Sequence, residues 1–361
     1  MSSQKMDSLQ YLRAIAATMV VVFHACASIM GEGGYGHTWL RSGVDVFFVI
    51  SGVVMWVSTA GRGVTTGQFY VHRIRRIVPL YWIVTTVVLA IGLFLPTLLR
   101  STRIEPMHVL ASYLFVPYPS PAVGAEGQLW PLLVVGWSLD NEMFYYLLFG
   151  LLLPLRERLR AVVVVSGFLG LALAGAVLQP RSPVLDFYMT HHAAEFGIGV
   201  AMGAVATSTH RTLPAGLALA ALVAGFASLP AVFVIFDNET GASPLIGGVL
   251  VTFGALALER AGHLPRIGWL ERIGDASYSL YLTHPLVLSA SISAASRLGL
   301  LTTLPMQLVF VTAATVVAIL VSFAVNRWVE RPLLALTSGR RRPAGEPGPK
   351  VEAVRSAPRS A

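Results

Sequence analysis

Residues 9–25 read LQYLRAIAATMVVVFHA, and this stretch decides the class of fold. It is an apolar run long enough to form most of a helix that crosses a lipid bilayer. Arg13 and His24 interrupt the run, and a charged group inside a span is unfavourable unless it is paired or solvated. The stretch therefore predicts a transmembrane helix with two functional polar groups. The same two residues argue against a cleaved signal peptide.

The composition extends this prediction to the whole chain. Of the 361 residues, 55% are hydrophobic and 12% are charged, whereas a soluble domain is roughly 25% charged. A disordered chain is excluded, and an ordinary soluble enzyme is disfavoured. The apolar runs are long and do not alternate, which argues against strands. We predict an all-α integral membrane protein with about ten transmembrane helices, near residues 8–30, 43–60, 76–96, 131–154, 160–178, 186–207, 213–230, 243–259, 277–298 and 304–328.

The positions of the 26 Lys and Arg residues predict the orientation of the bundle. With the N-terminus in the cytoplasm and alternating spans, twenty of these residues lie on the cytoplasmic side and five lie outside. Because basic residues concentrate in cytoplasmic loops, both termini are expected in the cytoplasm. Anionic lipid headgroups then account for the net charge of +8, and no nucleic acid is expected as a partner.

The chain divides into two parts by composition. Residues 1–335 are expected to form a single transmembrane domain. Residues 336–361 are rich in Arg, Pro, Gly and Ala and predict a disordered cytoplasmic tail. The short apolar run at residues 108–116 is interpreted as an interfacial helix.

Arg13 and His24 lie on one face of the first helix. Eleven residues separate them, which places their side chains about 20° apart around the axis and about 16.5 Å apart along it. Taken alone, Arg13 would reach the interface and His24 would bond a neighbouring helix. Taken together, they indicate a binding group and a proton-handling group that face one cavity.

The motif HRIRRIVPLYW, residues 72–82, predicts an anion site. Arg73 and Arg76 are three residues apart and share a helical face, whereas Arg75 points elsewhere. Arginine binds phosphate through paired hydrogen bonds, so a phosphate site on the cytoplasmic side is the functional interpretation. The alternative is ordinary positive loop charge, which we prefer for Arg75. Pro79 suits the first turn of the following span.

Two carboxylates lie in other apolar segments. Asp45, in GVDVFFVISG at residues 43–52, either caps its helix or orients the imidazole of His24. Glu142, in GWSLDNEMFYYLLF at residues 136–149, is interpreted as a partner for an intramembrane Arg or as part of an acceptor site.

The remaining polar residues give weaker signals. His191 and Glu195 are spaced for pairing, but a metal needs three or four ligands and no H-E-x-x-H motif occurs, so no metal is expected. His284, in SYSLYLTHPLV at residues 277–287, suits a proline-kinked helix with polar contacts to its neighbours. The sequence has no P-loop and no G-x-S-x-G motif, which argues against an ATP-driven pump and a serine hydrolase.

In order along the chain, these motifs resemble acyltransferase family 3, a family of integral membrane O-acyltransferases, and within it the bacterial exopolysaccharide O-acetyltransferases. Arg13 and His24 match the family's Arg-x10-His motif. The other matching segments are GVDVFFVISG, HRIRRIVPLYW, GWSLDNEMFYY, SYSLYLTHPL and the closing Glu330-Arg331-Pro332. The resemblance covers about residues 8–332, and six motifs in order make it specific.

The resemblance implies a ten-span enzyme of the bacterial inner membrane that transfers an acyl group, often acetyl from acetyl-CoA, to a carbohydrate hydroxyl. Joined to the interpretation of the residues, it leads to the hypothesis that His24 acts as general base, with Asp45 or Glu142 orienting it. Arg73 and Arg76 would hold the phosphates of CoA, together with Arg13. The acceptor would be a polysaccharide or its lipid-linked precursor, and succinyl or a longer acyl group remains an alternative to acetyl.

Two other classes of function remain open. A transporter or flippase of a lipid-linked saccharide would also combine many spans with intramembrane charges. The absence of repeated halves in the sequence disfavours it. A scaffold in a polysaccharide-export complex, with the charges serving helix pairing, is the third possibility.

Overall fold

A computed structural model describes residues 6–31, 38–95, 103–122, 124–125, 127–209, 211–235 and 242–337. All regular secondary structure in these ranges is helical, and a helix lies in each of the ten predicted segments. The elements are α1 (Asp7–Met30), η1 (Thr38–Ser42), α2 (Gly43–Thr59), α3 (Thr66–Phe94), α4 (Pro106–Leu114), η3 (Val134–Gly136), α5 (Trp137–Leu151), α6 (Glu157–Leu178), α7 (Pro183–Tyr188), α8 (His191–Ser208), α9 (Ala215–Ile235), α10 (Ala242–Arg260), α11 (Gly268–Asp275), α12 (Ser277–Arg297), α13 (Leu304–Val325), the π-helical segment η4 (Asn326–Glu330) and α14 (Arg331–Thr337).

Several of these helices are suited to a bilayer. Five helical stretches in the described ranges are long and apolar enough to cross a membrane: Asp7–Met30, Thr38–Thr59, Thr66–Phe94, Glu157–Leu178 and Leu304–Leu336. In α6 only 17% of the apolar window is buried inside the protein. An apolar helix face left open in this way suits contact with lipid. By contrast, α5 has 15 residues, fewer than the roughly 20 of a full crossing. The chain is an all-helical protein of membrane type, and the count of ten crossings and the orientation of the termini stay predictions.

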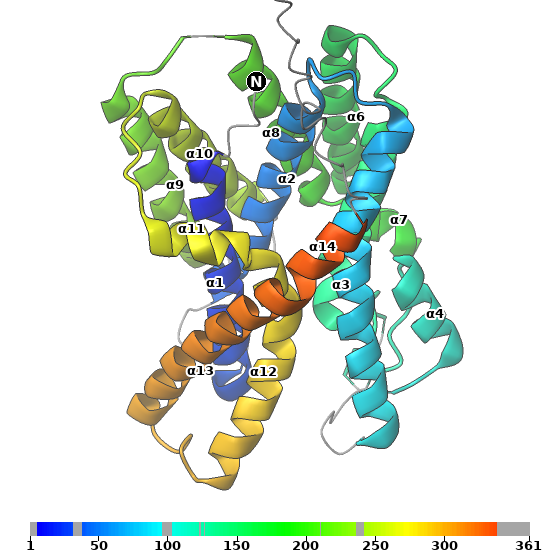
Figure 1. The fold of residues 1–361 in the computed structure, drawn as a ribbon, viewed down its shortest axis with the longest axis vertical. Coiled ribbons are helices and arrows are strands. Elements are labelled where there is room, and N and C mark those ends of the chain that lie inside the picture. The colour runs from blue at the N-terminus through cyan, green and yellow to red at the C-terminus, as the bar shows by residue number, and fades with distance from the viewer. Residues whose placement is uncertain are drawn as a thin grey trace, which may run out of the picture.

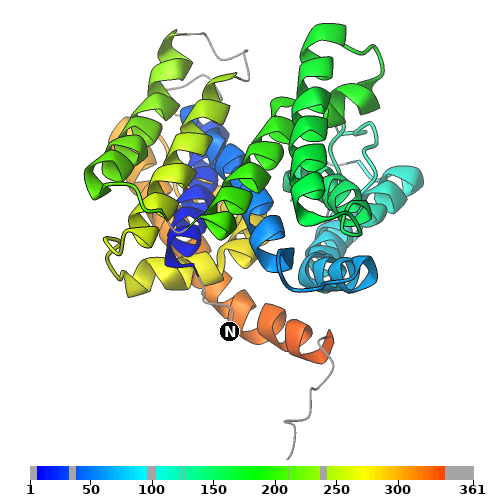
Figure 2. The ribbon, with the colours of Figure 1, turned by 90° about the horizontal axis from the view of Figure 1, so that it is seen from above.

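Helices α1 and α2 form the centre of the molecule. Figure 2 shows them in blue between the α9–α10 pair on one side and α3 with α6 on the other. Helix α1 contacts α2, α10, α11, α12 and α13, and α2 also contacts α8 and α10. In Figure 1, α12 and α13 run side by side and α14 continues from them across to α3. Helix α1, which carries Arg13 and His24, and helix α2, which carries the GVDVFFVISG motif, are thus surrounded by other helices of the chain.

Glycines allow α2 and α8 to pack closely against each other. A Cβ atom at Gly52 would collide with the backbone oxygen of Phe196, and one at Gly199 would collide with that of Val49. Small residues let helix backbones approach in this way inside a membrane. The close contact fixes the N-terminal ends of α2 and α8 beside each other.

A distant carboxylate caps the N-terminus of α1. Glu259, at the end of α10, accepts hydrogen bonds from the backbone N–H groups of Asp7 (2.6 Å) and Ser8 (3.4 Å). It also accepts one from the Ser8 hydroxyl. The first N–H groups of a helix have no partner within it, and a negative charge there is favourable. On the same side of α1, the Tyr11 hydroxyl accepts from the Ile267 N–H at 2.8 Å, which ties α1 to the start of α11.

The predicted start of the third span at residue 76 is wrong. Helix α3 begins at Thr66, where Thr65 and Gln68 form a capping box. Pro79 therefore lies inside the helix and not in its first turn. The basic motif is helical throughout, because the helix continues beyond the apolar segment that defined the prediction. The run at residues 108–116 is helical as far as Leu114, in α4 (Pro106–Leu114), and its interfacial location stays a prediction.

Candidate functional site

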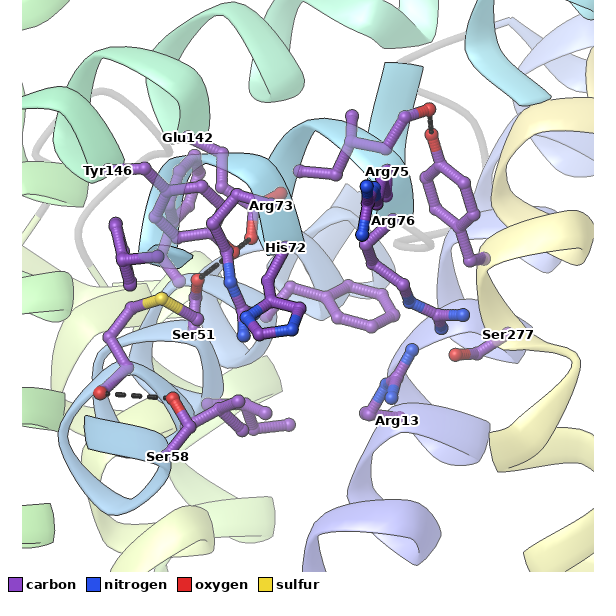
Figure 3. Close-up of a pocket in the computed structure, with 18 of the residues that line it drawn as sticks. Arg13, Ser51, Ser58, His72, Arg73, Arg75, Arg76, Glu142, Tyr146 and Ser277 are labelled. Atoms are coloured by element: carbon purple, nitrogen blue, oxygen red, sulfur yellow. Dashed lines mark hydrogen bonds between the residues drawn. The ribbon is translucent and has the colours of Figure 1, made fainter. Parts of the chain in front are cut away.

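Most of the site residues predicted from the sequence line one pocket. Its volume is about 830 Å³, and side chains of α1, α2, α3, α5, α12 and α14 line it. Its cationic lining consists of Arg13, Arg62, Arg73, Arg75 and Arg76. Figure 3 shows Arg13 reaching in from α1 and Arg76 from α3, with Ser277 beside them. The fold thus brings together the three arginines predicted to bind an anion, and it corrects the placement of Arg75, which lines the same pocket.

Arg73 is held over aromatic rings. Its guanidinium carbon lies 5.6 Å from the ring centre of Phe69 and 5.9 Å from that of Tyr146. Both distances fall in the range of cation–π attraction. The Arg73 Nε is buried and makes no hydrogen bond within the described part of the chain. The rings therefore position a cation whose N–H donors suit a ligand in the pocket.

Arg76 is held by Glu330, from the other end of the chain. The Arg76 Nη1 donates to Glu330 Oε1 at 2.6 Å. The second oxygen of Glu330 accepts from the Ser279 hydroxyl at 2.6 Å and from the Asn326 amide at 2.8 Å. The sequence indicated Glu330 only as part of a closing motif and gave no sign of this partner. The contact anchors η4 and α12 to α3 beside the pocket.

Glu142 lies on the α5 side of the pocket. Its Oε1 accepts from the Ser51 hydroxyl at 2.8 Å and also from the Tyr146 hydroxyl. Ser51 and Tyr146 line the pocket as well. The two interpretations open from sequence, a partner for an intramembrane Arg and part of an acceptor site, both stay predictions. Figure 3 shows this group facing Arg73 and His72.

His24 contacts a second histidine. The Nδ1 of His24 lies 2.9 Å from the Val20 carbonyl and 3.3 Å from Nε2 of His284. The Nδ1 of His284 lies 3.2 Å from the Leu280 carbonyl. A carbonyl only accepts, so both Nδ1 atoms carry the proton, and Nε2 of His284 accepts from His24. In this tautomer the lone pair of His24 is on Nε2, which is the arrangement that a general base needs.

The histidine pair lies next to the arginine pocket. His24 is not among the residues that line the pocket in the described ranges, but Tyr281 is. The ring centre of Tyr281 lies 6.0 Å from that of His284, which in turn lies 5.0 Å from that of His24. The Tyr281 hydroxyl also lies 2.7 Å from the hydroxyl of Ser138, another lining residue. Tyr281 therefore forms the boundary between the pocket and the histidine pair.

Asp45 contacts a different pair of histidines. Its Oδ1 accepts from Nε2 of His191 at 3.1 Å and lies 3.7 Å from Nδ1 of His192. His192 Nδ1 donates to Glu195 at 3.0 Å, so Glu195 pairs with His192 and not, as predicted, with His191. The sequence placed His191, His192 and Glu195 close together on one helix, and the packing of α2 against α8 adds Asp45 to them. The histidine seen to orient His24 is His284, and a catalytic role for Asp45 or Glu142 stays a prediction.

Family comparison identifies the class of protein. The family described as an acyltransferase domain matches residues 6–327. The chain belongs to this family, acyltransferase family 3, and is a membrane O-acyltransferase.

The chain is also similar to two individual proteins. The chain is 37% identical over 337 residues to the exopolysaccharide production protein ExoZ of Rhizobium meliloti, which covers 92% of this chain and all of that protein. It is 27% identical over 187 residues to the peptidoglycan O-acetyltransferase OatA of Listeria monocytogenes, which covers 49% of this chain and 29% of that protein. No solved structure matches the chain. The motifs that predicted the family from sequence all lie within or next to the matched residues.

Proposed function

We propose that the protein transfers an acetyl group from acetyl-CoA to a sugar hydroxyl of an exopolysaccharide or of its lipid-linked precursor. The observation that carries this proposal is the pocket with five arginines beside the His24–His284 pair. The polysaccharide acceptor is suggested by ExoZ and OatA, whose names refer to exopolysaccharide and to peptidoglycan O-acetylation. The proposed location is the bacterial inner membrane, with both termini in the cytoplasm.

The charge of the pocket favours a donor with several phosphates. Among the described lining residues, five arginines face one carboxylate, Glu142. CoA carries a diphosphate and a third phosphate, and guanidinium groups bind such oxygens through paired, charge-assisted hydrogen bonds. The pocket is also lined by Phe47, Phe48 and Tyr281, which suit the less polar pantetheine arm. With the phosphates at Arg13, Arg73 and Arg76, the thioester is directed toward Tyr281 and the histidine pair.

His24 is the proposed general base. Its Nε2 takes the proton of the sugar hydroxyl while the oxygen attacks the thioester carbonyl carbon. The C–S bond of the resulting tetrahedral intermediate then breaks, and the imidazolium returns its proton to the leaving thiolate. The products are the acetyl ester and free CoA. His284 accepts the Nδ1 hydrogen bond of His24, so neutral His24 has its lone pair on Nε2 before it takes the proton and again after it returns it.

The test is transfer of labelled acetyl from acetyl-CoA in membranes that carry the wild-type chain or His24→Ala. General-base catalysis contributes about 10²–10⁴-fold, so His24→Ala should lose label in polysaccharide and glycolipid fractions by that factor. The matched control is His263→Ala, since His263 is exposed. Equal labelling by His24→Ala would remove His24 from the chemistry. Movement of a lipid-linked saccharide with no thioester consumed would instead identify a flippase.

A further inference from the structure

Four potential metal ligands converge where α2 meets α8. Asp45 comes from α2, and His191, His192 and Glu195 come from α8. One ligand atom from each residue lies within 4.8 Å of the other three. The proposed acyl transfer does not use this cluster, which is separate from the arginine pocket.

The spacing of the ligand atoms suits a tetrahedral cation. Zinc–nitrogen and zinc–oxygen bonds of about 2.0–2.2 Å place tetrahedral ligands about 3.3–3.6 Å apart. The observed separations are 3.0 Å from His192 to Glu195, 3.1 Å from His191 to Asp45 and 3.7 Å from His192 to Asp45. Two of these three separations are slightly shorter than the expected range, and one is slightly longer. All four ligand atoms lie within 4.8 Å of one another, so the ligands that are furthest apart would have to approach by up to about 1.5 Å to reach a tetrahedral ion.

The charge of the cluster also favours a cation. The side chains of Asp45 and Glu195 are 5% and 0% exposed, and the ion-pair partners that the described residues offer them are histidines. Burial of two carboxylates is costly unless protons or a cation neutralise them. Each helix N-terminus contributes about half a positive charge, which offsets one of the two carboxylate charges and leaves the other to be neutralised by a proton or by a cation. A divalent ion would supply the missing charge.

An unused oxygen gives a separate indication. The Oε1 of Glu195 is buried and forms no hydrogen bond with a described residue, although the other oxygen of the same carboxylate binds His192. A buried carboxylate oxygen normally has a partner. A metal ion between the two helices would give Glu195 that partner.

We propose that Asp45, His191, His192 and Glu195 form a binding site for a divalent transition-metal ion of the zinc class. The ion would join α2 to α8 at their N-terminal ends, next to the glycine contact. Phe48 stacks on His192 with 4.5 Å between ring centres and also lines the arginine pocket. The ion would therefore stabilise one wall of the donor pocket without contacting the donor.

The experiment uses the full-length chain, purified in detergent, depleted with a chelator and then titrated with ZnCl₂ or CoCl₂. The wild-type chain should bind one Zn²⁺, show the visible bands of tetrahedral Co²⁺ and gain thermal stability on binding. Glu195→Gln and His191→Ala should weaken binding by about tenfold or more, since even groups that only support metal ligands contribute about 10–100-fold. The matched control, His263→Ala, should bind as the wild type does.

His191→Ala keeps the test decisive if Glu195→Gln fails to fold, because the His191 side chain is 31% exposed and its loss leaves the core packed. Two results would overturn the proposal. One is a wild-type chain that neither binds Zn²⁺ nor gains stability from it. The other is Zn²⁺ binding of equal strength in His191→Ala, which would assign the metal to other groups. These readouts do not involve acetyl transfer, so they are independent of the proposed function.

Discussion

At the scale of residues, the contact between His24 and His284 determines which ring nitrogen of His24 carries the proton. His24 donates from Nδ1 to Val20 and His284, and His284 in turn donates from its own Nδ1 to Leu280. In the proposed mechanism this chain of hydrogen bonds would play the part that a carboxylate plays in other general-base sites. Since His284 is 0% exposed, its position is fixed by packing.

His284→Ala should lower kcat with little change in the KM for acetyl-CoA. The expected loss is about two- to tenfold, because one hydrogen bond contributes about 0.5–1.5 kcal/mol. His284→Gln keeps an acceptor and should recover part of the activity. Steady-state rates with purified protein check this. A rise in KM at constant kcat would show that His284 serves donor binding instead.

Arg75 and Arg76 line the same pocket but differ in partner, since Arg76 binds the buried Glu330. Both Arg75→Ala and Arg76→Ala should raise the KM for acetyl-CoA by about tenfold or more, because a hydrogen bond to a charged group contributes about 1.5–3 kcal/mol. Only Arg76→Ala should also lower stability, by about 1–3 kcal/mol, because it leaves Glu330 without its cation. Donor titrations and thermal unfolding in detergent separate the two effects. Equal stability of the two variants would contradict the structural role of the Arg76–Glu330 pair.

At the scale of elements, the α2–α8 contact determines which polar groups meet. The glycines at this contact bring Asp45 to His191 and His192, and the same packing directs Ser51 toward Glu142. A change in the spacing of these two helices would alter both the cluster and the wall of the pocket.

Gly199→Ala should therefore destabilise the protein by about 1–3 kcal/mol, the usual effect of overpacking. The matched control is Gly170→Ala in α6, where an added Cβ meets no atom within 4 Å. That substitution should leave stability equal or slightly higher, because alanine favours helix over glycine. Thermal midpoints in one detergent provide the measurement. If both variants unfold at the wild-type temperature, the close approach of α2 and α8 is not under steric constraint.

The sequence predicted where helices lie better than it predicted the residues at which they begin. Hydropathy located a helix in each of ten segments, because lipid-facing and core residues are both apolar. It placed the start of α3 ten residues late, since Arg73, Arg75 and Arg76 ended the apolar window. The capping box at Thr65 and Gln68 was the signal that locates the true start.

The sequence alone did not predict which residues of distant segments contact each other. Arg13, Arg73 and Arg76 were predicted to share a site because each has the chemistry of an anion ligand, and the fold brings them together. His24 with His284 and Arg76 with Glu330 are separated by 260 and 254 residues. No local spacing encodes such contacts. They follow from how α12 packs against α1 and α3, and how η4 follows α13 along the chain.

At the scale of the whole molecule, the distribution of basic residues predicts that both termini are cytoplasmic. The native Cys26 is buried, so cysteines introduced at exposed loop positions should report on sidedness over a low background. Ser182→Cys should react with a membrane-impermeant maleimide in intact spheroplasts, and His263→Cys should react only after lysis. The reverse pattern would invert the topology and place the arginine pocket on the side opposite to cytosolic CoA.

The cap on α1 has a consequence for how the protein is made. Glu259 follows Asp7 by 252 residues, so α1 leaves the ribosome long before the side chain that completes its first turn. At synthesis rates of about 5–20 residues per second, that delay is roughly 10–50 s. His284 follows His24 by 260 residues, so the contact between the two histidines becomes possible after a slightly longer delay. If the first helix enters the bilayer during this interval, Arg13 and His24 lack their final surroundings there, which would make its insertion depend on other factors of the cell.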